Sequence, residues 1–158
     1  MFNLRALLAL FSAPRTPLDG ALRDLAHGRP ERALAALDEL LAAQTDPQRR
    51  AEIMNKRGVA LVELNRRDEA RSVFELVLAI DPQYAPAIVN LGNLELEAGE
   101  IDTAIALYQR ALEADSGSAS ACRHLAIAYR RAGRTADALN AFARARRLEG
   151  RRRPKQRT

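Results

Sequence analysis

The segment "IVNLGNLELEAGEIDTAIALYQRALEAD", residues 88–115, decides the fold of this chain. It places Gly92, Gly99, Ala104 and Tyr108 at fixed offsets between larger apolar residues. The apolar spacing predicts a helix on each side of Gly99, a residue type that favours the turn after a helix. No pair of residues in the segment looks catalytic, so the pattern calls for a structural explanation.

The same arrangement recurs along the chain with a step of 34 residues. Asn65, Gly99 and Gly133 hold the expected turn position in three successive units. A fixed period of this length indicates a stack of helix pairs. Three further sets of positions keep the same step: Gly58, Gly92 and Ala126; Ala70, Ala104 and Ala138; Phe74, Tyr108 and Phe142.

This pattern resembles the tetratricopeptide repeat family over residues 51–150, which hold three units in register. A fourth, degenerate unit precedes them: "HGRPERALAALDELLAAQTDP" aligns Gly28 with the turn residues and Leu37 with Phe74, after a first helix around 17–27. The resemblance implies an all-α fold, a right-handed α-solenoid of antiparallel helix pairs with three clear repeats and one degenerate N-terminal repeat.

The small residues have a packing role in such a fold. We expect Gly92 on the first helix of a pair to face Ala104 on the second at their closest approach, because a bulky side chain there would push the helices apart. The aromatic residues Phe74, Tyr108 and Phe142 are expected to fill the wider space toward the next pair.

The net charge of +5 is concentrated at the C-terminus. From Arg144 onward eight basic residues and one acid give +7, which leaves −2 for residues 1–143. We therefore predict a repeat domain over 14–148 and a basic disordered tail over 149–158. The tail is read as a solvated end, as a contact for anionic lipid, or as a nonspecific nucleic-acid arm, since it has no aromatic residue for base stacking.

Residues 1–13 form a separate apolar segment. Leu4, Leu7, Leu8 and Phe11 share one face of an amphipathic helix. Three interpretations remain open: a first helix docked on the body, an interfacial helix for a membrane or a partner, and an export signal. The single cysteine, Cys122, suits a reducing compartment, so we expect a cytoplasmic protein, with membrane association through this helix as the alternative.

The residues that usually carry catalysis are scarce. The histidines are His27 and His124, and Cys122 lies two positions from His124, where side chains on a helix do not face each other. One cysteine and two distant histidines cannot form a usual structural zinc site. We therefore expect no catalytic residue, no cofactor and no metal, and we interpret the chain as a non-enzyme.

Arrays of this kind bind partners mainly through the first helix of each pair. Asn90 holds the place at which peptide-binding members of the family contact a peptide backbone, although the same asparagine also occurs without a ligand. The carboxylate clamp of chaperone-binding members is not intact, because Asn55, Val59, Ser120 and His124 replace its other residues. The predicted groove residues are Asn55, Lys56, Val59, Asn90, Asn93, Leu96, Arg123, His124, Ile127 and Arg130.

The sequence thus predicts a non-catalytic scaffold, either an adaptor or an assembly factor, that holds a partly acidic protein segment with apolar anchors in its concave groove. The alternative is a nonspecific binder of nucleic acid or of an anionic membrane surface, acting through the tail and the N-terminal helix. The last helix pair has no capping helix after it, so Leu139 and Phe142 are candidates for uncovered surface. A weak homodimer, or capture of a partner, is expected at that end.

Overall fold

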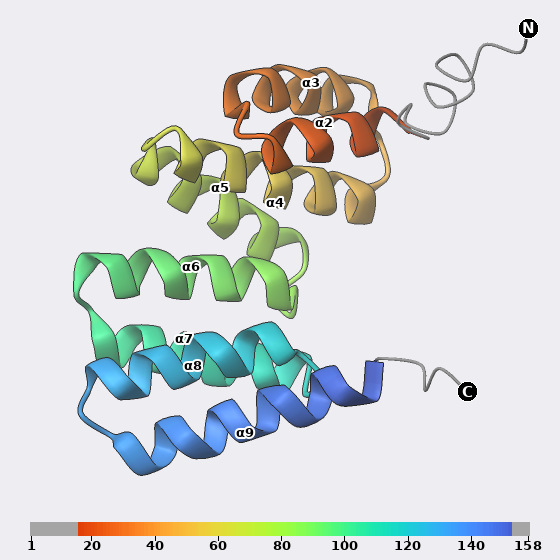
Figure 1. The fold of residues 1–158 in the computed structure, drawn as a ribbon. Coiled ribbons are helices and arrows are strands. Elements are labelled where there is room, and N and C mark those ends of the chain that lie inside the picture. The colour runs from red at the N-terminus through yellow and green to blue at the C-terminus, as the bar shows by residue number, and fades with distance from the viewer. Residues whose placement is uncertain (1–15, 153–158) are drawn as a thin grey trace, which may run out of the picture. The chain divides into compact units, whose positions relative to one another are not determined.

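The computed structural model describes residues 16–152, and within this range the chain forms eight helices and no strand (Figure 1). The predicted all-α class of consecutive helix pairs is therefore confirmed. The predicted N-terminal segment 1–13 lies outside the described residues, and so do residues 153–158 of the tail predicted over 149–158. The helices are α2 (Pro17–Ala26), α3 (Pro30–Ala43), α4 (Pro47–Glu63), α5 (Arg67–Ile80), α6 (Ala85–Ala98), α7 (Ile101–Ala114), α8 (Ala119–Arg131) and α9 (Thr135–Arg152).

Several helix starts are fixed by side-chain caps. Thr16 and Asp19 form a reciprocal capping box at α2, in which each side chain accepts from the other residue's backbone N–H at 3.0–3.1 Å. Asp46 caps α4, and Ser118 caps α8 by accepting from the Ala121 N–H at 3.2 Å. These polar residues satisfy N–H groups that a helix cannot satisfy itself.

The turn inside each helix pair is made by one residue in the left-handed region. Gly28, Asn65, Gly99 and Gly133 have φ values of 65°, 61°, 89° and 74°. This confirms the four turn positions that the sequence indicates. Glycine and asparagine are the residues that adopt this backbone conformation at least cost, which explains why only they occur there.

The helices divide into two compact units between Val73 and Phe74, inside α5. In the first unit α2 packs against α3, and α3 packs against α4. Its apolar core includes Ala21, Leu37 and Ile53, which are buried. The degenerate N-terminal repeat is thus a genuine helix pair, α2–α3, as the sequence predicts.

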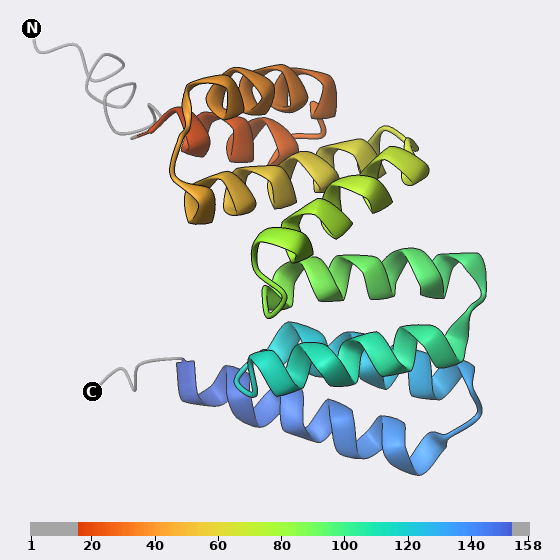
Figure 2. The same ribbon diagram turned by 180° about the vertical axis from the view of Figure 1, so that it is seen from behind.

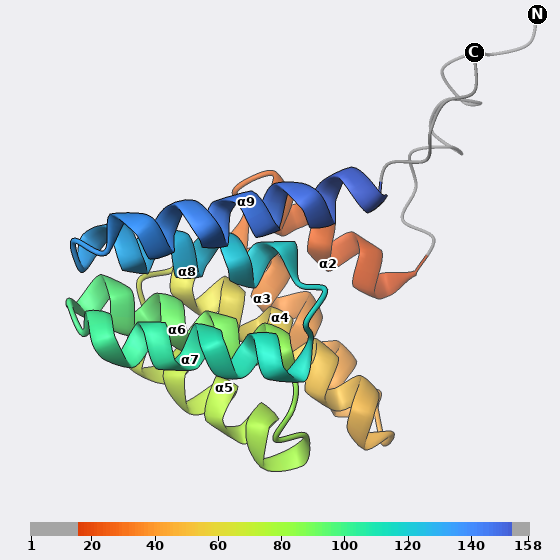
Figure 3. The same ribbon diagram turned by 90° about the horizontal axis from the view of Figure 1, so that it is seen from below.

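The second unit holds the remainder of α5 and the helices α6 to α9. The pairs α6–α7 and α8–α9 each lie side by side, as views from behind and from below show (Figures 2 and 3), and α7 packs against α8. Ile88, Tyr108 and Cys122 are completely buried in one continuous core drawn from α6, α7, α8 and α9. This unit contains most of the predicted binding residues.

The ring of Tyr108 packs against Gly92 where α6 lies beside α7. A Cβ atom at Gly92 would meet this ring, and the nearest ring atom, Cε1, would be 2.6 Å away. That Gly92 also faces Ala104 at the closest approach of the two helices stays a prediction. Tyr108 lies one helical turn further along α7, and its long ring extends across the interface to reach the glycine.

The last helix differs from the prediction in two ways. It ends at Arg152 and not at Leu148, because Gly150 has no positive φ and so does not interrupt it; the sequence places a proline only at 154. Phe142 does not fill an internal space, since 52% of it is exposed, whereas its repeat equivalents Phe74 and Tyr108 are fully buried. No further helix pair among residues 16–152 follows α9 to cover it.

Candidate protein-binding site

The ten predicted groove residues belong to three helices in two units. Asn55, Lys56 and Val59 lie on α4 in the first unit, and the other seven lie on α6 and α8 in the second. Lys56 and Val59 are half-buried. No partner is present, so their role in binding remains a prediction.

Two of these residues are not exposed, and that part of the expectation is wrong. Asn55 is 2% exposed and Leu96 is 7% exposed. In the case of Leu96, helix α8 covers the end of α6: the Arg131 guanidinium donates to the Leu96 carbonyl oxygen at 2.9 Å. A side chain beneath another helix can support a binding surface but cannot reach a ligand in this conformation.

Tyr108 brings two predicted residues from different helices together. Its hydroxyl donates to Oδ1 of Asn93 on α6 at 2.8 Å. Its ring lies against the ring of His124 on α8, with the centroids 5.7 Å apart and the planes tilted by 33°. Burial raises the pKa of the Tyr108 hydroxyl, which therefore stays a hydrogen-bond donor at neutral pH.

These contacts fix which atoms Asn93 and His124 can offer to a partner. Since Oδ1 of Asn93 accepts from Tyr108, its amide NH₂ remains to donate. Nδ1 of His124 lies 2.8 Å from the carbonyl oxygen of Ser120, which can only accept, so Nδ1 carries the proton. Neutral His124 therefore keeps Nε2 as an acceptor. Asn90, one turn before Asn93 on α6, is half-buried.

The structure brings three other predicted residues together in a groove between α8 and α9. Arg123, Ile127 and Arg130 line a hollow of about 360 Å³ together with residues of α9. Leu139 and Phe142 are 67% and 52% exposed within it. The remaining lining residues are Ala126, Thr135 and Ala138. We call this hollow the α8–α9 groove.

The α8–α9 groove has apolar walls and a basic rim. Arg123 forms an ion pair with Glu149 on α9, and both side chains are nearly half exposed. Arg130 has no ion-pair partner within residues 16–152. The ten predicted groove residues include the α8 wall but not the α9 wall. Leu139 and Phe142 of the α9 wall were predicted separately, as candidates for uncovered surface at the end of the last helix pair, and their exposure agrees with that prediction.

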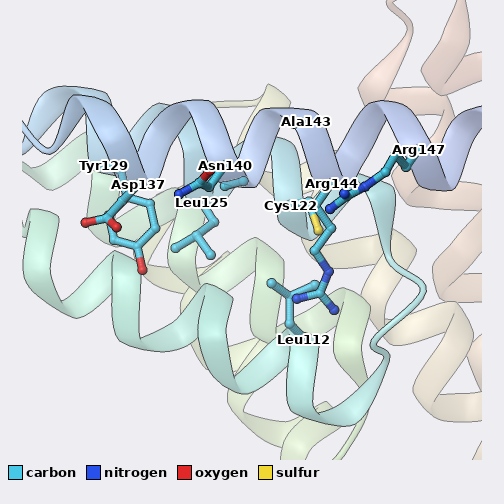
Figure 4. A pocket seen from close by; sticks show the side chains of 10 residues that line it. Leu112, Cys122, Leu125, Tyr129, Asp137, Asn140, Ala143, Arg144 and Arg147 are labelled. Atoms are coloured by element: carbon cyan, nitrogen blue, oxygen red, sulfur yellow. The ribbon is translucent and has the colours of Figure 1, made fainter.

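A second hollow, of about 450 Å³, lies on other faces of the same two helices (Figure 4). Cys122 and Leu125 line it from α8, and Arg144 and Arg147 line it from α9. Cys122 is fully buried, and this burial raises the pKa of its thiol. His124 does not line this hollow, and its Nδ1 lies 2.8 Å from the carbonyl oxygen of Ser120.

Neither a metal centre nor a membrane span is found in the part of the chain that the structure describes. No group of three or more histidine, cysteine, aspartate or glutamate side chains converges there. None of the helices between residues 16 and 152 is long and apolar enough to cross a membrane.

Comparison with known proteins agrees with the repeat pattern. One model of the tetratricopeptide repeat matches residues 18–85 and 89–155, and a second model of the same repeat matches residues 61–110. No curated protein sequence matches the chain.

Similar solved structures include two described as crystal structures of MamA. The first is 23% identical, with a TM-score of 0.67, and the match covers 93% of this chain and 84% of that one. The second is 22% identical, with a TM-score of 0.66 and coverage of 96% and 81%. At this level of identity the likeness shows the fold alone. The family models, in contrast, span most of the sequence, and the chain belongs to the tetratricopeptide repeat family.

Proposed function

We propose that this protein is a non-catalytic scaffold, an adaptor or assembly factor, that holds a segment of a partner protein against its second unit. The observation that carries the proposal is the α8–α9 groove, in which Leu139 and Phe142 expose more than half of their surface. Soluble proteins rarely leave large apolar side chains together on the surface, and such patches mark interaction sites.

Polar groups on α6 and α8 support the same function. Asn90 on α6 carries an amide, a group that can pair with both the N–H and the C=O of a peptide backbone, and Asn93 keeps its NH₂ to donate to a backbone C=O. Asn93 and His124 are held in place through Tyr108, so they need little ordering when a partner arrives. A protein-binding role also agrees with the membership of the tetratricopeptide repeat family.

Cross-linking followed by mass spectrometry on the full chain tests the proposal. We expect a protein partner whose cross-links map to α6, α8 or α9, and we expect Asn90→Ala with Arg123→Ala to weaken its capture. The thermal midpoint should change little, because the Arg123–Glu149 ion pair is exposed and such pairs contribute little. Failure to capture any protein would contradict the scaffold role, and capture that survives both changes would exclude these two residues.

A second function has one observation in its favour. Arg144, Arg147 and Arg151 line a third hollow of about 360 Å³ beside Ser116, and they continue the basic sequence toward residue 158. As an alternative, the chain binds nucleic acid or an anionic lipid surface nonspecifically through this region. Removing residues 153–158 and replacing Arg147 and Arg151 with alanine should then abolish a strongly salt-dependent binding to duplex DNA or anionic vesicles. An adaptor would keep its protein partner after the same changes.

A further inference from the structure

We propose that the α8–α9 groove binds an acidic amphipathic helix of a partner protein, in the place that the first helix of a further repeat would occupy. This inference rests on the proposed scaffold function and specifies the partner's shape and charge. It depends on three observations: the repeat register, the exposure of the α9 wall, and the arginines on the rim.

The repeat register shows what kind of element fits the groove. One period before Leu139 and Phe142, at the same positions of the preceding helix pair, are Ile105 and Tyr108. Those two residues are 5% and 0% exposed. Helix α8 packs against α7 there and places the ring of His124 on the ring of Tyr108. The equivalent surface of the α8–α9 pair, at Leu139 and Phe142, is therefore shaped to pack against a helix.

The rim shows that the occupant is not simply another copy of α8. The positions equivalent to Arg123 and Arg130 are Val89 and Leu96 in the preceding pair, and both of these are buried. The change from apolar residues to arginine puts two cations seven residues apart on α8, about 10 Å along the helix. A helix with carboxylates two turns apart on its flank matches this spacing, and its apolar stripe would cover Leu139 and Phe142.

The ion pair already present does not prevent this binding. Glu149 pairs with Arg123 at the surface, where ion pairs contribute little to stability, so a partner carboxylate can replace it. Arg146, one turn beyond Phe142 on α9, adds a third cation near the groove. The balance of three arginines against one glutamate favours an acidic ligand.

Charge also argues against the two occupants that the chain itself could supply. Residues 1–13 have an apolar stripe, but Arg5 is their only charged side chain, so they offer no carboxylate. The same face of a second copy would bring Arg123 and Arg130 toward identical arginines, and like charges across an interface are unfavourable.

The inference can be tested with three synthetic peptides. One is a lactam-bridged helix with leucines along one face and glutamates on the flanks, the second has lysines in place of these glutamates, and the third is residues 1–15 of this chain. Fluorescence anisotropy with the full-length protein should show the glutamate peptide binding at least tenfold more tightly than the lysine peptide. Higher salt should reduce the difference, because the selecting charges are exposed.

Variants of the protein locate the site. Leu139→Glu should lower the affinity for the glutamate peptide at least tenfold. Arg130→Glu should make the protein prefer the lysine peptide to the glutamate peptide. Leu76→Glu is the matched control, because Leu76 is 56% exposed on α5 and lies outside the groove. This variant should bind the glutamate peptide as tightly as the original protein does. Circular dichroism checks that all three variants keep their helical content.

Other results would overturn the inference. Equal affinity for the glutamate and lysine peptides would exclude selection of an acidic partner. Unchanged affinity of the Leu139→Glu variant for the glutamate peptide would exclude the α8–α9 groove as the binding site. Tighter binding of residues 1–15, or a dimer in sedimentation that Leu139→Glu dissociates, would assign the groove to the chain itself. A natural partner that cross-links to the protein yet is retained by Leu139→Glu refutes this inference and leaves the scaffold function standing. The absence of any protein partner refutes the scaffold function.

Discussion

Gly92 on α6 lies directly against the ring of Tyr108 on α7, so closely that a Cβ atom at position 92 would be 2.6 Å from Cε1 of the ring. The ring cannot move aside easily, because Tyr108 is fully buried and its hydroxyl donates a hydrogen bond to Asn93, the residue that follows Gly92 in α6. The missing side chain thus sets the distance between two helices, and the tyrosine in turn orients a predicted binding residue.

Replacing Gly92 with alanine should destabilise the protein. Overpacking of a well-filled interface costs about 1–3 kcal/mol, whereas alanine regains only about 0.5–1 kcal/mol of helix stability over glycine. The control is Gly150→Ala in α9, where an added Cβ meets nothing within 4 Å and stability should rise by up to about 1 kcal/mol. Urea unfolding followed by circular dichroism measures both changes. Equal effects of the two substitutions would contradict the packing role of Gly92.

The period of 34 residues was enough to predict the helix pairs and their turns. Asn65 was identified as a turn residue because it occupies the position of Gly99 and Gly133, and its φ of 61° confirms this. The period also indicates which residues are equivalent, and so it located the degenerate pair α2–α3. Repetition is visible in a single sequence because each unit must bury the same faces.

The side-chain environment was harder to predict. Asn55 was expected on an exposed face because it lies on the first helix of its pair, yet it is 2% exposed. Gly150 was expected in a disordered tail, but without a positive φ it simply continues α9. The polarity of a residue is a weak predictor of its exposure, and a glycine is a weak predictor of the end of a helix, when tertiary packing decides both. The ring of Tyr108 reaches Gly92 through a side-chain geometry that spacing alone does not describe.

Phe74 and Phe142 occupy the same repeat position, so truncating each side chain isolates the effect of burial. We expect Phe74→Ala to lower the free energy of unfolding by about 3–5 kcal/mol, the usual cost of emptying a buried aromatic site. Phe142→Ala should cost about 1 kcal/mol or less, since 52% of this residue is exposed and surface changes are mild. Parallel urea titrations of the two variants provide the comparison. A large loss for Phe142→Ala would mean that another element covers it.

Removal of residues 1–13 tests the apolar segment outside the described residues. Since Leu4, Leu7, Leu8 and Phe11 share one helical face, we expect the deletion either to lower stability or to release the protein from membranes. Thermal unfolding and membrane fractionation are the two measurements. The variant with Leu7→Glu and Phe11→Glu keeps the chain length and should reproduce the effect. If the deletion leaves stability, fractionation and partner binding unchanged, the segment is dispensable.

The buried hydroxyl of Tyr108 and the buried thiol of Cys122 should make the fold sensitive to alkaline pH. Burial raises both pKa values above their ordinary values of 10.0 and 9.0, because each neutral form is favoured in the core. Well below pH 9 both groups keep their protons whether the chain is folded or not, and their full contribution to stability is present. As pH rises further, the unfolded chain releases these protons first, so stability falls by up to about 1.4 kcal/mol per pH unit for each group.

Urea unfolding between pH 7 and pH 11 should show this decline. The slope above pH 10 should become shallower in Tyr108→Phe, and the slope that begins near pH 9 should become shallower in Cys122→Ala, whatever each substitution costs at neutral pH. An unchanged slope in both variants would place the alkaline sensitivity in other groups.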